Sequence, residues 1–178
     1  MIGNHRDLSQ STADGIGTKL RWNGLNLTRP YTGFDKIGTG PMPGLKTLQK
    51  WLLFTGNGQL TNLGDFVVRD KRGSENKGNL SVHATGRATD IGWHKREVVE
   101  GAMFWLLWNA DTLGLEMLAD YWPQPFGRTW KCDRGDWKVY DKKTIHGAPG
   151  GRWIHIEISP EMASSSAKME AAIRKTMP

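Results

Sequence analysis

The sequence contains very little cysteine. Its single cysteine, Cys132, excludes an internal disulfide and a zinc site built from a cluster of thiolates. Any metal ion in this chain must therefore be held by histidine and carboxylate side chains. Because the chain has only five histidines, the candidate ligands are few.

Long hydrophobic runs are also missing. A helix that crosses a bilayer needs about 18 consecutive apolar residues, and the longest apolar stretch, AMFWLLW from Ala102, is far shorter. This stretch predicts a buried helix and no membrane insertion. The first residues, MIGNHRDLSQ, do not show the charged-then-apolar pattern of a signal peptide. We therefore expect any action outside a cytoplasm to depend on another delivery route.

Positive charge is in excess. The chain carries 24 Lys and Arg against 18 Asp and Glu, which gives a net charge of +6. This excess favours a polyanionic partner, either nucleic acid or an anionic cell envelope. The basic residues are scattered rather than grouped into a stripe, which disfavours nucleic acid. The 178 residues match one domain of ordinary size.

The domain divides into three regions. Residues 1–45 are rich in Gly, Pro, Thr and Asn and predict a loop-rich N-terminal extension. Residues 46–160 form the expected core, which opens with a short helix in LKTLQKWLLF and a brief strand around Phe66–Val68. Residues 161–178 predict a peripheral C-terminal helix.

The second half of the core mixes helices and strands. KREVVEGAMFWLLWNADTLGLEMLADY predicts two helical segments with a break near Asn109–Gly114. WKCDRGDWKVYD predicts a hairpin, and APGGRWIHIEISP predicts a closing strand. The fold class is therefore α+β, a small antiparallel sheet with helices packed on one face.

The closing strand has two chemically different faces. Alternation in RWIHIEI places three isoleucines toward the core and three other side chains on the opposite face. The two sets are Ile154, Ile156 and Ile158 against Trp153, His155 and Glu157. A histidine beside a carboxylate on an exposed sheet face is a candidate metal ligand.

The stretch SVHATGRATD, residues 81–90, supplies further candidates. Gly86 permits a tight turn between His83 and Asp90, and Ala88 leaves room on the returning limb. With His155 these residues make a set of two histidines and one carboxylate. Such a set with an open fourth position is typical of catalytic zinc sites, where the metal activates water and polarises a carbonyl. A solvated loop or a capping arrangement is the alternative interpretation.

This stretch resembles the S-x-H-x-x-G-x-A-x-D signature of the zinc D,D-carboxypeptidase and L-alanyl-D-glutamate endopeptidase family, which includes D-alanyl-D-alanine dipeptidases and many phage endolysins. WIHIE, residues 153–157, is similar to the family's second motif, in which a strand carries the last histidine. The resemblance covers roughly residues 66–160. It implies that His83, Asp90 and His155 bind Zn²⁺, that Ser81 supports the loop, and that Arg69, or secondly Arg72, contacts the substrate.

The sequence departs from the family at the general base. Most members carry a glutamate three residues before the last histidine, and some related enzymes carry a histidine two residues before it. These positions are Arg152 and Trp153 here. The remaining candidates for the base are side chains near the second motif: Glu157, His146, Asp136 and Asp133. Glu157 is also a candidate for orienting His155 from behind.

The other histidines and tryptophans carry weaker signals. His94 reads as a cap or surface residue at the start of a helix, and His5 lies in a loose terminus. Trp153 and Trp137 are candidates for lining a substrate groove, with Trp122 and Trp130 as further possibilities.

The resemblance implies a zinc metallopeptidase that hydrolyses peptidoglycan stem peptides, as in endolysin-like lysis of the cell wall. Such a protein would reach the wall from the host cytoplasm or as part of a virion. The alternative is a catalytically silent, zinc-containing protein that binds the wall or serves a structural role in a phage. A nucleic-acid-binding domain is a third hypothesis that rests on charge alone.

Overall fold

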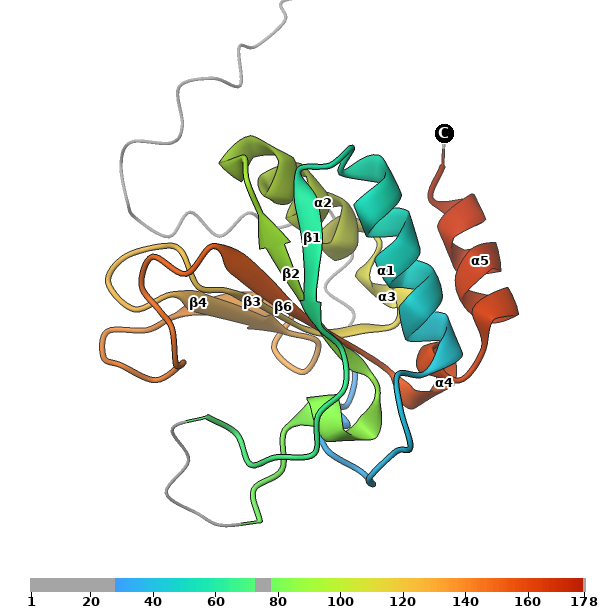
Figure 1. Ribbon diagram of the computed structural model, residues 1–178, viewed down its shortest axis with the longest axis horizontal. Coiled ribbons are helices and arrows are strands. Elements are labelled where there is room, and N and C mark those ends of the chain that lie inside the picture. The colour runs from blue at the N-terminus through green and yellow to red at the C-terminus, as the bar shows by residue number, and fades with distance from the viewer. Residues whose placement is uncertain (1–27, 73–77, 178) are drawn as a thin grey trace, which may run out of the picture.

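The computed structural model describes residues 28–72 and 78–177, so His5 and most of the predicted N-terminal extension lie outside the described residues. Six antiparallel strands form one open sheet in the order β1-β2-β6-β3-β4-β5 (Figure 1). The strands are β1 (Leu60–Gly64), β2 (Ala88–Trp93), β3 (Leu115–Asp120), β4 (Arg128–Lys131), β5 (Asp136–Val139) and β6 (Trp153–Ile158). The α+β prediction is confirmed.

The helices cover one face of this sheet. They are α1 (Pro43–Thr55), α2 (Arg96–Trp108), α3 (Ala110–Leu113), α4 (Pro160–Ala163) and α5 (Ser166–Lys175), and a 3₁₀ turn, η1 (Val82–Thr85), precedes β2. Figure 1 shows α1 and α5 side by side. No helix among residues 28–72 and 78–177 is both long and apolar enough to cross a bilayer.

The first helix forms as the periodicity predicts. Pro43 occupies its first turn, where a missing N–H does no harm, and Leu45, Leu48 and Leu52 recur on one buried face. These leucines pack in the same core cluster as the three isoleucines of β6. The predicted division of β6 into a core face and a polar face is therefore confirmed.

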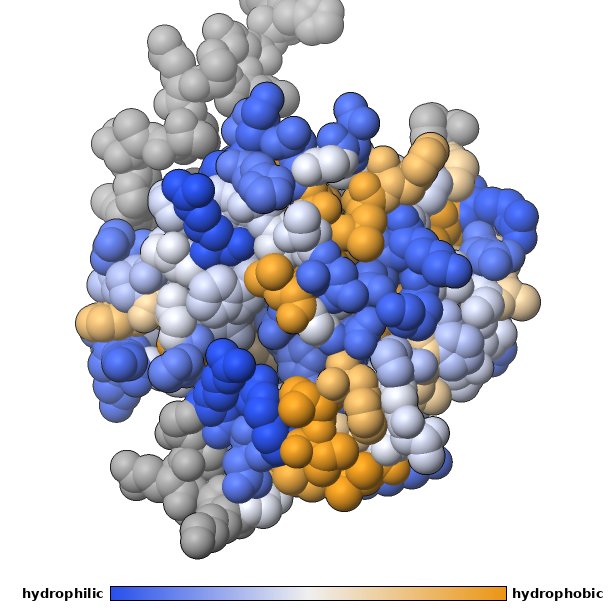
Figure 2. Space-filling model, in the orientation of Figure 1, coloured by the Kyte–Doolittle hydropathy of each residue, from blue (hydrophilic) through white to orange (hydrophobic). Residues whose placement is uncertain are grey.

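The C-terminal helix contributes to this core. α5 lies at the edge of the molecule, yet it buries Met169, Ala172 and Ile173. Ser165 caps its first turn by accepting a hydrogen bond from the Lys168 N–H. Figure 2 shows hydrophobic side chains at the surface beside α1 and α5, among hydrophilic areas that spread over most of the visible face.

The prediction of a second helical segment after the break at Asn109–Gly114 is wrong, and the break itself contains the short helix α3. Gly114 adopts a left-handed conformation (φ 63°) and ends α3, after which LEMLAD forms the strand β3. This strand lies between β6 and β4 and is covered on both faces. A strand buried on both faces lacks the apolar–polar alternation that distinguishes it from a helix.

The predicted strand at Phe66–Val68 is also wrong. The pairing segment lies earlier, in β1, and residues 66–69 form no strand; only Asp70 makes an isolated bridge, to Leu80. Val67 and Val68 are 40% and 51% exposed. The valines favour a strand, but β1 already occupies the edge of β2, so this stretch has no partner in the sheet.

Candidate metal centre

Two of the predicted ligands are brought together by strand pairing. Asp90 of β2 lies directly opposite His155 of β6 in the antiparallel register. Residues paired in this way project from the same face of the sheet, with their Cβ atoms about 5 Å apart. This face is opposite to the one that carries the isoleucines and the helices. The sheet register alone therefore places a carboxylate against an imidazole.

The third ligand arrives through the turn that precedes β2. The Ser81 side chain accepts a hydrogen bond from the His83 N–H at 3.4 Å and caps η1, as predicted for a residue that supports the loop. Gly86 ends η1 with φ 78°, and a Cβ at this position would lie 2.1 Å from the Gly40 carbonyl oxygen. Only glycine fits such a close left-handed turn. The turn directs His83 back over Asp90.

The three side chains converge on one point. His155 Nδ1 lies 2.8 Å from Asp90 Oδ1 and 3.2 Å from His83 Nε2, and His83 Nε2 lies 3.3 Å from Asp90 Oδ1. In a tetrahedral zinc site, ligand atoms about 2.0–2.2 Å from the metal are about 3.3 Å from one another. The two separations from His83 match this spacing, and the His155–Asp90 separation is shorter, at a hydrogen-bond distance. His83, Asp90 and His155 thus form a largely buried group able to hold a metal ion.

The electrostatics of this group favour a cation. Burial by itself disfavours the ionised Asp90, but hydrogen bonds from His155 and His83 outweigh burial and hold the pKa of Asp90 well below its ordinary value. Burial likewise disfavours a charged His155, yet its hydrogen bonds to Asp90 and Glu157 raise its pKa to about 10. These shifts favour a protonated His155 between the two carboxylates in the metal-free chain, and a metal ion must displace the proton on Nδ1.

Glu157 contacts His155 on the side of the ring that faces away from Asp90. Its Oε1 lies 2.9 Å from His155 Nε2, the ring nitrogen that does not face Asp90. The other oxygen, Oε2, accepts a hydrogen bond of 2.6 Å from the Tyr31 hydroxyl. Burial would raise the pKa of Glu157, but the hydrogen bonds with His155 and Tyr31 and the Lys131 charge lower it. Such carboxylate–histidine pairs fix the orientation and tautomer of a metal ligand.

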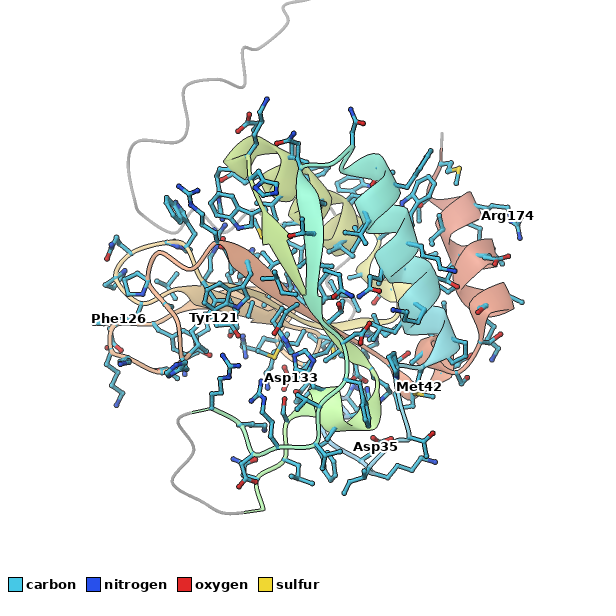
Figure 3. The ribbon with its side chains drawn as sticks, in the orientation of Figure 1. Asp35, Met42, Tyr121, Phe126, Asp133 and Arg174 are labelled. Atoms are coloured by element: carbon cyan, nitrogen blue, oxygen red, sulfur yellow. The ribbon has the colours of Figure 1, made fainter. Side chains whose placement is uncertain are left out.

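The group opens into a cavity of about 260 Å³. Four cationic side chains line this cavity together with the candidate ligands: Arg69, Lys71, Arg72 and Lys131. Arg69 lines the cavity but does not lie on a strand. Its backbone is fixed beside the first motif, because its carbonyl oxygen accepts a hydrogen bond from the Ser81 N–H at 3.0 Å. Trp153 also lines the cavity and stacks on Tyr121, which Figure 3 labels over the sheet.

The fold places only some of the candidates for the general base at the cavity. His146 lines the cavity. Asp136 and Asp133 are exposed residues of the β4–β5 hairpin and lie outside the cavity lining. Arg152 is exposed and places its guanidinium 5.9 Å from the ring centre of Trp93 and 6.0 Å from that of Trp122.

Four other residues considered from the sequence also lie apart from the cavity lining. Trp137 is not in the cavity lining; it packs partly against the core, with the Arg128 guanidinium 4.5 Å from its ring centre. Trp130 packs beside it against the core, and Trp122 contacts Trp93 edge to face. His94 is exposed just before α2.

Sequence reasoning missed Tyr31, Lys71 and Lys131. Tyr31 lies in the N-terminal extension, outside the two motifs, and single residues of an irregular segment have no periodicity to mark them. The two lysines adjoin predicted turns, where charged residues are common. Only the fold shows that these three side chains face the metal ligands.

A comparison of the chain with known protein families, with curated proteins and with solved structures finds no match. The class of this protein therefore rests on its own residues. They define an open antiparallel sheet that carries a candidate His–His–Asp metal centre at the base of a cation-lined cavity.

Proposed function

We propose that this chain is a zinc-dependent peptidase that hydrolyses peptidoglycan stem peptides. The observation that carries the proposal is the convergence of His83, Asp90 and His155 in a cavity lined by positive charge. The order and spacing of these residues match the zinc peptidase signature at residues 81–90 and 153–157, which supports the assignment. The ligand set of two histidines and one carboxylate favours zinc over harder ions that prefer oxygen ligands.

A zinc ion held by this group would supply a Lewis acid and activate water for attack on a peptide carbonyl. The cationic wall of the cavity has a complementary role. Arg69 is our candidate for stabilising the negative charge that develops on the attacked carbonyl oxygen. Stem peptides carry several carboxylates, so the remaining cations provide electrostatic complementarity to the substrate.

We assign the general base to His146. Glu157 uses both carboxylate oxygens, one on His155 and one on Tyr31, and it holds the side of His155 away from Asp90. Asp136 lies outside the cavity. In the proposed step the His146 imidazole takes a proton from the attacking water and returns it to the amide nitrogen as the C–N bond breaks.

The setting of this activity follows from charge and from the family resemblance. A net charge of +6 favours retention on an anionic cell wall. An endolysin released from the host cytoplasm, or a virion-associated lysin, is the role that we propose.

A second function has one specific observation in its favour. The position of the family's glutamate base is Arg152, which points away to the Trp93 and Trp122 rings. A chain without a base would bind zinc and the wall and leave peptides intact.

The deciding experiment measures amino groups newly released from purified cell walls by the zinc-loaded chain. We expect release that disappears with a chelator and returns with zinc. Stoichiometric zinc without release would support the silent wall-binding protein, and a chain that binds no zinc would contradict both.

A further inference from the structure

A segment of the N-terminal extension crosses behind the metal centre. Residues 29–35, here called the strap, have no helix or strand but are anchored along their length. The Arg29 N–H donates to the Cys132 carbonyl at 3.0 Å, and the Thr32 hydroxyl donates to Glu116 Oε1 at 2.6 Å. The buried Arg87 binds the Gly33 carbonyl.

These anchors reach different parts of the sheet. Cys132 follows β4, Glu116 lies on β3, and Arg87 immediately precedes β2. Arg87 also contacts Glu116 Oε2 and Asp35 Oδ1, both at 3.3 Å, so the strap is tied to a buried ionic network. The position of the strap is thus set by contacts that do not involve the metal centre.

The strap presents Tyr31 to the metal centre. The Tyr31 hydroxyl donates to Glu157 Oε2 at 2.6 Å, while Glu157 Oε1 lies 2.9 Å from His155 Nε2. His155 Nδ1 in turn lies 2.8 Å from Asp90. The Lys131 ammonium lies 3.7 Å from the centre of the Tyr31 ring and restrains it from the other side. A continuous chain of contacts therefore runs from the strap to the ligand atom.

We infer that Tyr31 is a positioning residue for the metal ligand His155 and acts through Glu157. A carboxylate held at one oxygen only can rotate about its last bond, whereas Glu157 is held at both. With Glu157 fixed, its Oε1 keeps a proton on His155 Nε2, so that Nδ1, which lies 2.8 Å from Asp90 and 3.2 Å from His83, is the nitrogen left to bind a metal ion once its proton is displaced. The inference rests on the metal centre of the proposed function but not on peptide cleavage.

The hydroxyl of Tyr31 remains a donor throughout the physiological pH range. Burial, and then the neighbouring Glu157 carboxylate, raise the pKa of Tyr31 far above its ordinary value. The contact is thus a charge-assisted hydrogen bond from a neutral phenol, which is among the stronger kinds.

The test compares two tyrosine-to-phenylalanine variants in a zinc-affinity measurement by competition with a chromophoric chelator. Loss of an outer hydrogen-bond partner commonly weakens metal binding about 10- to 100-fold, and we expect about 3- to 10-fold for Tyr31→Phe because it acts one residue further out. Tyr140→Phe is the matched control, since Tyr140 lines the same cavity but its hydroxyl pairs with Thr129 Oγ1 at 3.0 Å and not with Glu157. The visible spectrum of the cobalt-loaded chain should change in Tyr31→Phe and not in the control.

A double-mutant cycle with Glu157→Gln separates a positioning role from a merely structural one. If Tyr31 acts through Glu157, adding Tyr31→Phe to Glu157→Gln should weaken zinc binding by less than about twofold further. Independent, multiplying effects would overturn the inference, and so would equal affinities of Tyr31→Phe and the unsubstituted chain. If the unsubstituted chain binds no zinc, both the inference and the proposed function fail.

A measurement on the unsubstituted chain covers the case in which Tyr31→Phe does not fold. The Tyr31 hydroxyl proton should appear as a slowly exchanging, downfield NMR signal, and zinc should shift it as Glu157 adjusts to the metal-bound His155. A signal that does not respond to zinc would overturn the inference.

Discussion

The two faces of the sheet each carry a carboxylate, and the two carboxylates have different partners. Asp120 shares the helix face with Ile154, whereas Asp90 shares the cavity face with His155. Asp120 is fully buried and accepts two hydrogen bonds from Arg96 and two from Arg128. Asp90 is partly exposed and contacts two imidazoles.

The difference separates a structural cluster from a candidate metal-binding group. Arginine stays charged at any physiological pH, so the Asp120 cluster is complete without another ion. A histidine can exchange its proton for a metal ion, because its neutral ring is a metal ligand. The Asp120 cluster ties the start of α2 to β3, whereas the Asp90 group can exchange its proton for a metal ion.

The largest expected effect is the loss of zinc when one of the three candidate metal ligands is removed. His83→Ala, Asp90→Ala and His155→Ala should each reduce bound zinc to well below one per chain, with affinity lower by more than the roughly 100-fold upper range of outer partners. Metal analysis after dialysis measures this. His94→Ala, at an exposed histidine, is the control. Full zinc in all three variants would place the site elsewhere.

The next effect concerns turnover with zinc retained. His146→Ala should lower the rate of amino-group release by about 10²- to 10⁴-fold, the range of general acid–base catalysis. Asp136→Asn should leave the rate unchanged, because Asp136 lies outside the cavity. Normal turnover in His146→Ala would reject our assignment of the base.

Removing Asp120 from its cluster with Arg96 and Arg128 should lower the stability of the fold and leave zinc affinity unchanged. Asp120→Ala removes the carboxylate that Arg96 and Arg128 share and leaves Arg96 with Glu100, and removal of one member of a buried ion pair costs about 3–5 kcal/mol. Urea unfolding of the zinc-free chain measures this loss. A comparable loss in Asp90→Ala would mean that both clusters are structural.

Low pH should weaken the ion pairs that Asp120 forms with Arg96 and Arg128. Burial would raise the pKa of Asp120, but the two arginines hold it below its ordinary value. Because the folded-state pKa is lowered, the contribution to stability is complete above the unfolded pKa of about 3.9 and is lost as the pH falls through the folded value. Unfolding free energies of the wild type and Asp120→Asn should therefore converge below about pH 4. A constant difference would show that Asp120 does not titrate with unfolding.

The smallest expected effect is at the position of the family's missing base. Arg152→Ala should change zinc affinity and turnover by less than about twofold, since Arg152 is exposed and contacts two rings outside the cavity. Assays of both quantities on one preparation provide the comparison. A large drop in turnover alone would give Arg152 a role with substrate.

Much of the metal centre was predictable because its information is local. Alternation in RWIHIEI placed His155 opposite the core, and Gly86 indicated the turn between His83 and Asp90. The strand β3 was not predictable from periodicity, because both of its faces are covered and its two carboxylates, Glu116 and Asp120, are buried against arginines rather than marking a solvent face. The predicted strand at residues 66–68 failed because a β-prone stretch still needs a neighbour to pair with.

By itself the sequence determined the ligand types, the turn that joins the first two ligands, and the two-faced strand that carries the third. These features depend on residue spacing along one segment. Only the tertiary structure decided that Asp90 stands opposite His155, that Tyr31 supports Glu157, and that His146 rather than Asp136 lines the cavity. Such contacts join segments tens of residues apart, and packing of the whole sheet selects them.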